Sequence, residues 1–194
     1  TQAFFSRPID GIDTFYSCRT FFGVPAGGYL STDAIADFEL ETDESYTRMD
    51  SLVKRIDLSP EAGYDDFHRT SKEFHHIPIR RMSNFTKRMM QGIDYGSVAQ
   101  RRLDNYNVLC KHLGGRQLNY GEVPMIFPFE SEQGQELRKK LIENKVFVAK
   151  YWPNVDEWAG ENALETWMAN HILPLPIDQR YGKEDMERIL NIIN

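Results

Sequence analysis

The sequence lacks any long apolar run. No apolar stretch approaches the roughly eighteen residues that a membrane-spanning helix needs. Positive charge is also scarce, because 23 lysines and arginines stand against 29 aspartates and glutamates, a net charge of −6. Such an acidic balance argues against a general nucleic-acid binder and against a protein of membrane surfaces. We therefore expect neither nucleic acid nor a membrane among the partners.

Cysteine is rare as well. The chain has Cys18 and Cys110, which lie far apart and belong to no pairing motif. Such cysteines are typical of reduced thiols, so we expect a cytoplasmic protein. The sequence also begins with neither methionine nor the charged segment of a secretion signal. From this start we expect a fragment or a processed product.

A metal-binding pattern is missing too. His68, His75 and His76 cluster in the chain, but no cysteine or carboxylate completes a ligand spacing around them. We interpret them as exposed or interface histidines and expect no metal. No Gly-x-Ser-x-Gly segment surrounds Ser17, so the sequence does not predict nucleophilic catalysis by that serine.

Two further clusters have competing interpretations. Three basic pairs, at 80–81, 87–88 and 101–102, predict a solvated helix face or a dimer contact rather than a nucleic-acid site. Three tryptophans gather near the C-terminus and predict core and surface packing in a small domain, because large aromatic side chains dominate buried contacts. A stacking site for a ligand is the alternative for these residues, which are Trp152, Trp158 and Trp167.

The composition that is present is that of a globular protein. Apolar residues make up 41% and aromatic residues 12% of 194 positions, enough for one full domain or two small ones. Residues 57–80 are polar and mixed, and they predict a long, partly ordered crossing segment. Apolar periodicity and turn residues predict extended segments over 12–16, 29–32, 123–129, 146–149 and 173–176, and helices over 45–56, 83–93, 98–113, 131–144, 161–171 and 182–193.

The most informative stretch is residues 15–30. It is aromatic, then small and turn-forming, then apolar again, which predicts a strand, a tight loop and a second strand. Gly27 and Gly28 permit a positive φ at the entry of the second strand. Because glycine has no side chain, the backbone at these two positions also lets a ligand or a second chain approach closely.

Three segments together resemble one family. They are residues 15–32, the Gln2-Ala3 dipeptide and residues 173–186. In order and spacing they are similar to the DegT/DnrJ/StrS-type sugar aminotransferases, fold-type I enzymes that use pyridoxal phosphate (PLP). The resemblance covers nearly the whole chain, but only as the C-terminal half of such a protein.

The resemblance implies an incomplete PLP-dependent transferase-like fold. An α/β remnant of the PLP-binding large domain would span residues 1–80, and a helical connector would span residues 81–115. A small α+β C-terminal domain would then span residues 116–194. The first half of the large domain would lie outside this chain.

The resemblance also implies positions of site residues. Gln2 matches the end of the family's Glu-Asp-x-x-Gln-Ala segment, whose glutamine lies near the phenolic oxygen of the cofactor and whose aspartate would precede residue 1. Ser17 corresponds to a serine that touches the cofactor's phosphate. Thr20 stands where the family has the lysine that forms the Schiff base. The neighbouring Arg19 predicts either a contact with an anionic ligand or an ion pair with a nearby aspartate, Asp10 or Asp13.

A threonine hydroxyl cannot form an imine, so we do not expect this chain to hold PLP covalently. We expect an aminotransferase-like protein of nucleotide-sugar or surface-polysaccharide biosynthesis that does not transaminate alone, with a nucleotide sugar as a candidate ligand. The alternative is a non-catalytic binding or assembly module that kept the scaffold. A fragment of a large domain exposes apolar surface and sheet edges, and the family dimerises, so we expect a homo-oligomer, a dimer.

Overall fold

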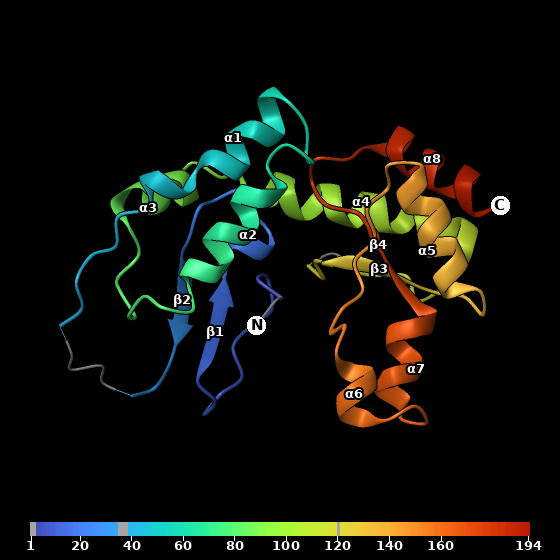
Figure 1. Ribbon diagram of the computed structural model, residues 1–194, viewed down its shortest axis with the longest axis horizontal. Coiled ribbons are helices and arrows are strands. Elements are labelled where there is room, and N and C mark those ends of the chain that lie inside the picture. Colours follow the sequence, from blue (N-terminus) through green and yellow to red (C-terminus); the bar gives the residue numbers. More distant parts are fainter. Residues whose placement is uncertain (1–2, 35–38, 120) are drawn as a thin grey trace. The chain divides into compact units, whose positions relative to one another are not determined.

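The computed structural model describes residues 3–34, 39–119 and 121–194 (Figure 1). The chain divides into two compact units, Thr1–Asp94 and Tyr95–Asn194. The division falls inside residues 81–115, the predicted connector. One predicted helix of that connector therefore belongs to the first unit and the other to the second.

A short hairpin forms the sheet of the first unit. Strand β1 (Thr14–Ser17) pairs antiparallel with β2 (Gly28–Ser31), and the 3₁₀ helix η1 (Cys18–Thr20) follows β1 directly. Both strands lie within a residue or two of their predicted positions. Tyr16, Phe21 and Phe22 are buried, whereas the cross-strand neighbours Phe15 and Leu30 are exposed.

Helices complete the first unit. They are η2 (Tyr46–Arg48), α1 (Asp50–Asp57), α2 (Tyr64–Glu73) and α3 (Asn84–Gln91). The predicted start of α3 is confirmed, because the Ser83 hydroxyl oxygen accepts a hydrogen bond from the Thr86 amide at 3.0 Å. That hydroxyl also lies 2.5 Å from the Ser45 hydroxyl, so a buried polar contact joins two distant segments.

Helix α2 corrects the prediction of a partly ordered segment over 57–80. Ion pairs join it to α1, since Lys54 Nζ lies 2.6 Å from Asp66 Oδ2 and Arg69 lies 3.1 Å from Asp50. Phe67 on α2 is 46% exposed. The ten residues of α2 include two aromatic and five charged side chains, so the apolar signal was too sparse for the sequence pattern to predict the helix.

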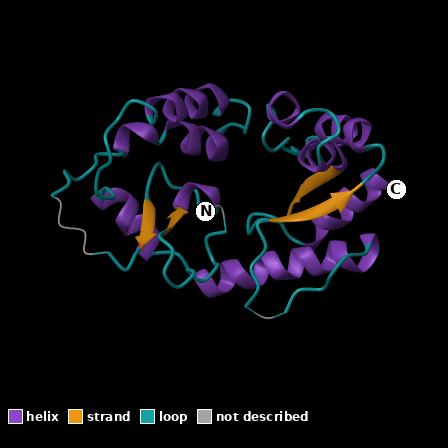
Figure 2. Cartoon of the chain, turned by 90° about the horizontal axis from the view of Figure 1, so that it is seen from below, coloured by secondary structure: helices purple, strands orange, loops and turns teal. Residues whose placement is uncertain are grey.

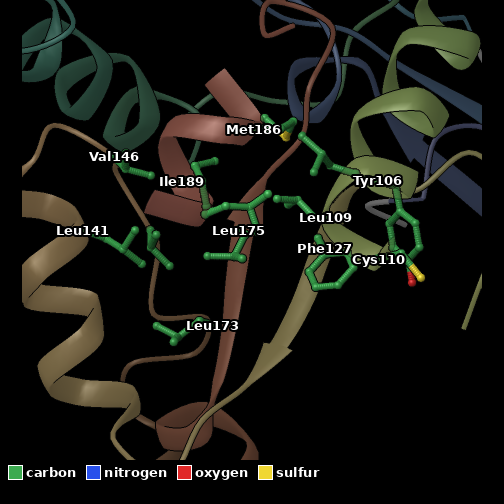
Figure 3. Packing of buried hydrophobic residues seen from close by; sticks show 13 residues of the cluster. Tyr106, Leu109, Cys110, Phe127, Leu141, Val146, Leu173, Leu175, Met186 and Ile189 are labelled. Carbon is green, nitrogen blue, oxygen red and sulfur yellow. The ribbon is translucent and has the colours of Figure 1, made fainter. Parts of the chain in front are cut away.

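The second unit packs its helices against a two-stranded antiparallel sheet. The strands are β3 (Ile126–Glu130) and β4 (Ile172–Pro176), with Phe127 opposite Leu175 and Phe129 opposite Leu173. Figure 3 shows Leu173, Leu175 and Phe127 converging with side chains of the surrounding helices. The helices are α4 (Tyr95–Leu113), α5 (Gly134–Glu143), α6 (Val155–Ala159), α7 (Leu164–His171) and α8 (Lys183–Ile193).

The predicted strand over 146–149 does not form. Val146 and Val148 are buried in the core and Phe147 between them is exposed, which is the alternation that a strand shows. However, the Val146 amide donates to the Leu141 carbonyl at 2.9 Å, closing the end of α5. The alternating side chains of this segment are therefore buried as in a strand, but no strand among the described residues pairs with its backbone.

Taken together, the described residues contain eight α-helices and two separate two-stranded antiparallel sheets (Figure 2). This is a mixed α and β architecture, and the fold-type I assignment stays a prediction. Within the described part of the chain, no helix has the length and apolar character needed to cross a membrane.

Candidate functional site

The hairpin of the first unit holds two of the three predicted site residues. Ser17 is the last residue of β1 and Thr20 is the last residue of η1, and both are half-buried. The third, Gln2, lies outside the described residues. Ser17 and Thr20 thus both lie at the closed end of the hairpin, separated by Cys18 and Arg19.

Backbone hydrogen bonds hold Thr20 in place. The Cys18 amide donates to the Gly27 carbonyl at 3.1 Å, which continues the ladder past the last strand pair. The amides of Phe21 and Phe22 both donate to the Cys18 carbonyl, at 3.2 and 3.0 Å. Residues 18–22 therefore form one tight turn, and Thr20 lies inside it.

The predicted positive φ occurs at Gly27, where φ is +106°. The close approach that this glycine permits is made by another part of the same unit. A Cβ atom at Gly27 would lie 2.9 Å from Thr86 Cγ2 and 3.1 Å from the Met82 side chain. Glycine is therefore required so that the start of α3 can pack against the hairpin.

An aromatic cluster covers one side of the turn. The Phe4 ring lies 4.8 Å from Phe22, 6.1 Å from Phe21 and 6.4 Å from Tyr16, mostly edge to face. Such pairs add to the burial of the rings themselves. The Tyr16 hydroxyl is buried and has no hydrogen-bond partner among the described residues.

Arg19 does not form either of its predicted ion pairs with Asp10 or Asp13 within the described residues. Its guanidinium lies over two rings of the α2 region, 5.4 Å from the Phe67 centroid and 4.8 Å from the Phe74 centroid. Burial lowers the pKa of Arg19, and the nearby charge of Arg48 lowers it further. Aromatic rings thus lie against the guanidinium, and the alternative of a contact with an anionic ligand stays a prediction.

Cys18 is the buried centre of the turn. Its side chain is fully buried, and burial raises the pKa of the thiol to about 11. Because the thiolate is the nucleophile, a thiol with so high a pKa is inert at neutral pH. The prediction of a free thiol is confirmed for both cysteines.

The side chains of the hairpin can be compared with what covalently bound PLP requires. That cofactor needs an amine that forms an imine, and Thr20 offers a hydroxyl. The lysines of the first unit lie instead on α1, α2 and α3, at Lys54, Lys72 and Lys87. The hydroxyl of Ser17 is a single neutral group for a phosphate. The residues present do not fit a covalent PLP site.

The second unit contains a cavity. Its volume is about 410 Å³, within the size range of ligand pockets. Trp152 and Trp158, which line it, are 66% and 76% exposed, so of the predicted core and surface packing these two residues show the surface part. Trp167 instead stacks on His171, with ring centroids 5.0 Å apart.

The cavity could not be predicted from the sequence, because its lining comes from three separate stretches. These residues are Ile126, Tyr151, Trp152, Val155, Trp158, Glu165, Met168, Ala169, Ile172 and Pro174. The sequence indicated only that Trp152 and Trp158 lie close together in the chain, and a stacking site for a ligand was the alternative interpretation of these tryptophans. The polar part of the lining, Glu165, was missed.

The histidine cluster has no metal-binding geometry in the described part of the chain, where no group of three or more potential ligands converges. His68 lies on α2 with its ring edge-on to Tyr64 at 4.4 Å. His75 and His76 follow that helix and are exposed, as predicted.

No family model, no curated protein and no solved structure matches this chain. The resemblance to sugar aminotransferases therefore stays a prediction.

Proposed function

We propose that this chain is an aminotransferase-like protein of nucleotide-sugar or surface-polysaccharide biosynthesis that does not transaminate by itself. The observation that supports the proposal is the position of Thr20. It ends a 3₁₀ helix inside the β1–β2 hairpin, at the position where the resemblance expects a lysine. The hydroxyl there leaves the chain without the amine that imine chemistry needs.

The local geometry supports this assignment without invoking the cofactor. Thr20 is half-buried, and the turn around it is held by the Cys18 and Gly27 backbone and by the packing of α3 on Gly27. A side chain at position 20 is therefore held on a defined backbone. A lysine placed there would start from that backbone rather than from a free loop.

The experiment adds PLP to the chain and follows the visible absorbance of a protein Schiff base, then fixes any imine with borohydride and maps it by mass spectrometry. The chain as it stands should give no specific fixed site. Thr20→Lys should give absorbance and a label at position 20. If the unaltered chain is labelled at one lysine in stoichiometric amount, the non-transaminating proposal fails.

A matched control separates a site from accidental labelling of surface lysines. Thr47→Lys also replaces a threonine in a 3₁₀ helix of the first unit, but Thr47 is exposed and lies outside the hairpin. We expect it to behave like the unaltered chain. Equal labelling of the two variants, or none in Thr20→Lys, would show that position 20 is not the lysine position of the family.

The second candidate is a non-catalytic binding or assembly module, and a different observation favours it. Phe15 and Leu30 are cross-strand neighbours on one face of the hairpin, and they are 69% and 56% exposed. A pair of large apolar side chains on a sheet face is typical of a surface that another chain covers. For this second candidate function we propose that two copies of the chain associate through this face as a homodimer.

A further inference from the structure

The sheet of the second unit has two different faces. Phe127, Leu173 and Leu175 point into the core, while the alternate residues Ile172 and Pro174 line the cavity of about 410 Å³. This follows from the pleat, because successive residues of a strand lie on opposite faces. The cavity is thus backed by a sheet that the core holds firmly, with α6 and α7 contributing its other walls.

Three aromatic rings form part of the walls. Tyr151 and Trp152 are neighbours with ring centroids 5.8 Å apart and planes at 58°, and Trp158 follows on α6. Trp152 has a φ of +49°, a conformation that is uncommon for a residue with a bulky side chain. Such backbone outliers cluster at ligand sites, because the surrounding structure must hold them in place.

Local contacts hold the loop that carries these rings. The Val155 amide donates to the Trp152 carbonyl at 2.9 Å, which closes a turn at the outlier. Lys150 Nζ lies 2.9 Å from Asp156 Oδ2, so an ion pair joins the two ends of the loop. The charge of Lys150 is thereby matched by a carboxylate outside the cavity lining.

The lining of the cavity carries one acidic side chain and no lysine or arginine. Glu165 is the ionisable carboxylate in the lining. Residues 151–179 contain no lysine and no arginine, but they contain five acidic residues, which are Asp156, Glu157, Glu161, Glu165 and Asp178. The charge of Arg102 acts on the lining residue Tyr151, but its guanidinium is engaged by Gln179 and two backbone carbonyls. A ligand that enters therefore meets aromatic side chains and the acidic residue Glu165.

This combination decides among ligand classes. A phosphate-bearing ligand, a nucleotide sugar included, would bring negative charge next to Glu165 with no lysine or arginine in the lining to neutralise it. A free sugar needs several hydrogen-bond partners for its hydroxyls, and the lining offers few polar side chains. A cation with an apolar surface fits both features, because it is attracted by ring faces and by the carboxylate.

We propose that this pocket binds an organic cation with an alkylated ammonium group, held by Tyr151, Trp152 and Trp158 and oriented by Glu165. Two sources carry that chemistry, a free small molecule of the choline type and an alkylated lysine side chain of a partner protein. The proposal goes beyond the function proposed for the hairpin, and it stands or falls independently of Thr20.

The test titrates the chain with choline by isothermal calorimetry and compares it with the neutral carbon analogue, in which a carbon atom replaces the ammonium nitrogen. The two probes have nearly the same shape, so the difference between them reports the charge. We expect choline to bind at least about tenfold more tightly, as cation–π contacts and a carboxylate predict. Equal binding of the two, or no binding of choline, overturns the proposal.

Variants locate the binding. Trp158→Leu should weaken choline binding at least about tenfold, and its exposed side chain makes loss of folding an unexpected outcome. Glu165→Gln should weaken choline binding but leave the neutral analogue unchanged. Trp167→Leu is the matched control, because Trp167 stacks on His171 and does not line the cavity. Full choline affinity in Trp158→Leu, with a native circular dichroism spectrum, would refute the proposal.

A last titration distinguishes the two sources of the cation. A short peptide with trimethyllysine is compared with choline and with the same peptide carrying unmodified lysine. Binding of the trimethylated peptide more tightly than choline supports a protein partner. Weaker binding of that peptide supports a free small molecule. Indifference of the peptides to methylation, together with equal binding of choline and its neutral analogue, contradicts both.

Discussion

At the scale of single residues, a charged side chain can be buried although the sequence predicts that it is solvated. Arg102 belongs to a basic pair for which the sequence predicted a solvated face or a dimer contact, but it is only 2% exposed. Its guanidinium donates to Gln179 Oε1 at 2.9 Å and to the carbonyls of Pro124 and Met125 at 3.2 and 3.0 Å. Burial lowers the pKa of Arg102 to about 10. Its neighbour Arg101 is exposed, as predicted.

Cys18 yields a prediction at the same scale. In the folded chain its pKa is raised to about 11 from an ordinary value near 9, so its thiolate is roughly a hundredfold scarcer at pH 8 than in an unfolded chain. Alkylation of Cys18 by iodoacetamide, followed by peptide mass spectrometry, should be at least about a hundredfold slower in native protein than in urea. Comparable rates in the two conditions would mean that Cys18 is accessible as a thiolate.

The same shift fixes the sign of a pH effect. Below the ordinary pKa both the folded and the unfolded chain hold the proton, and the contribution of Cys18 to stability is fully present. Between about 9 and 11 the unfolded chain loses the proton first, so the free energy of unfolding falls as pH rises. Cys18→Ala should flatten this part of the profile in urea titrations, whereas an unchanged slope would contradict the assignment.

At the scale of elements, β4 joins the core of the second unit to its pocket. Leu175 is fully buried against β3 and the helices, and Leu164 at the start of α7 is 66% exposed. Leu175→Ala should lower the free energy of unfolding by about 2–5 kcal/mol, because it opens a cavity in the core. Leu164→Ala should change it by less than about 0.5 kcal/mol.

Tryptophan fluorescence during urea unfolding is the suitable measurement. The three tryptophans, which are Trp152, Trp158 and Trp167, all lie in the second unit, so the signal reports that unit alone. A similar decrease in the free energy of unfolding in Leu175→Ala and Leu164→Ala would show that burial at β4 does not govern the stability of the second unit.

At the scale of the whole molecule, exposed apolar surface on the first unit predicts self-association. Among the described residues no third strand extends the β1–β2 sheet, and its residues Phe15 and Leu30 are exposed. Light scattering after size exclusion should show a dimer at micromolar concentration. Leu30→Lys should shift it towards monomer, because it places a charge on that face.

Leu58→Lys is the matched control, since Leu58 is 70% exposed in the same unit but lies beyond the end of α1 rather than on the sheet. It should leave the dimer intact. A monodisperse monomer over the whole concentration range would contradict self-association, and equal disruption by both variants would move the interface away from the sheet.

The sequence alone determined the elements whose signals are local. The hairpin with its glycine turn, the Ser83 cap of α3 and the long amphipathic helices follow from turn chemistry, capping and periodicity, which act over a few residues. The identity of residue 20 as threonine is likewise a sequence fact, and it excludes imine chemistry at that position whatever the fold.

Only the tertiary structure decided the features that depend on distant partners. Ion pairs join α2 to α1, and Arg102 is buried among carbonyls far along the chain. Val146 and Val148 pack in the core although their segment forms no described strand. The cavity lined by Trp152 and Trp158 likewise forms only where residues of β3, β4, α6 and α7 meet. Local propensity cannot specify such contacts, because burial and pairing are set by which segments meet in three dimensions.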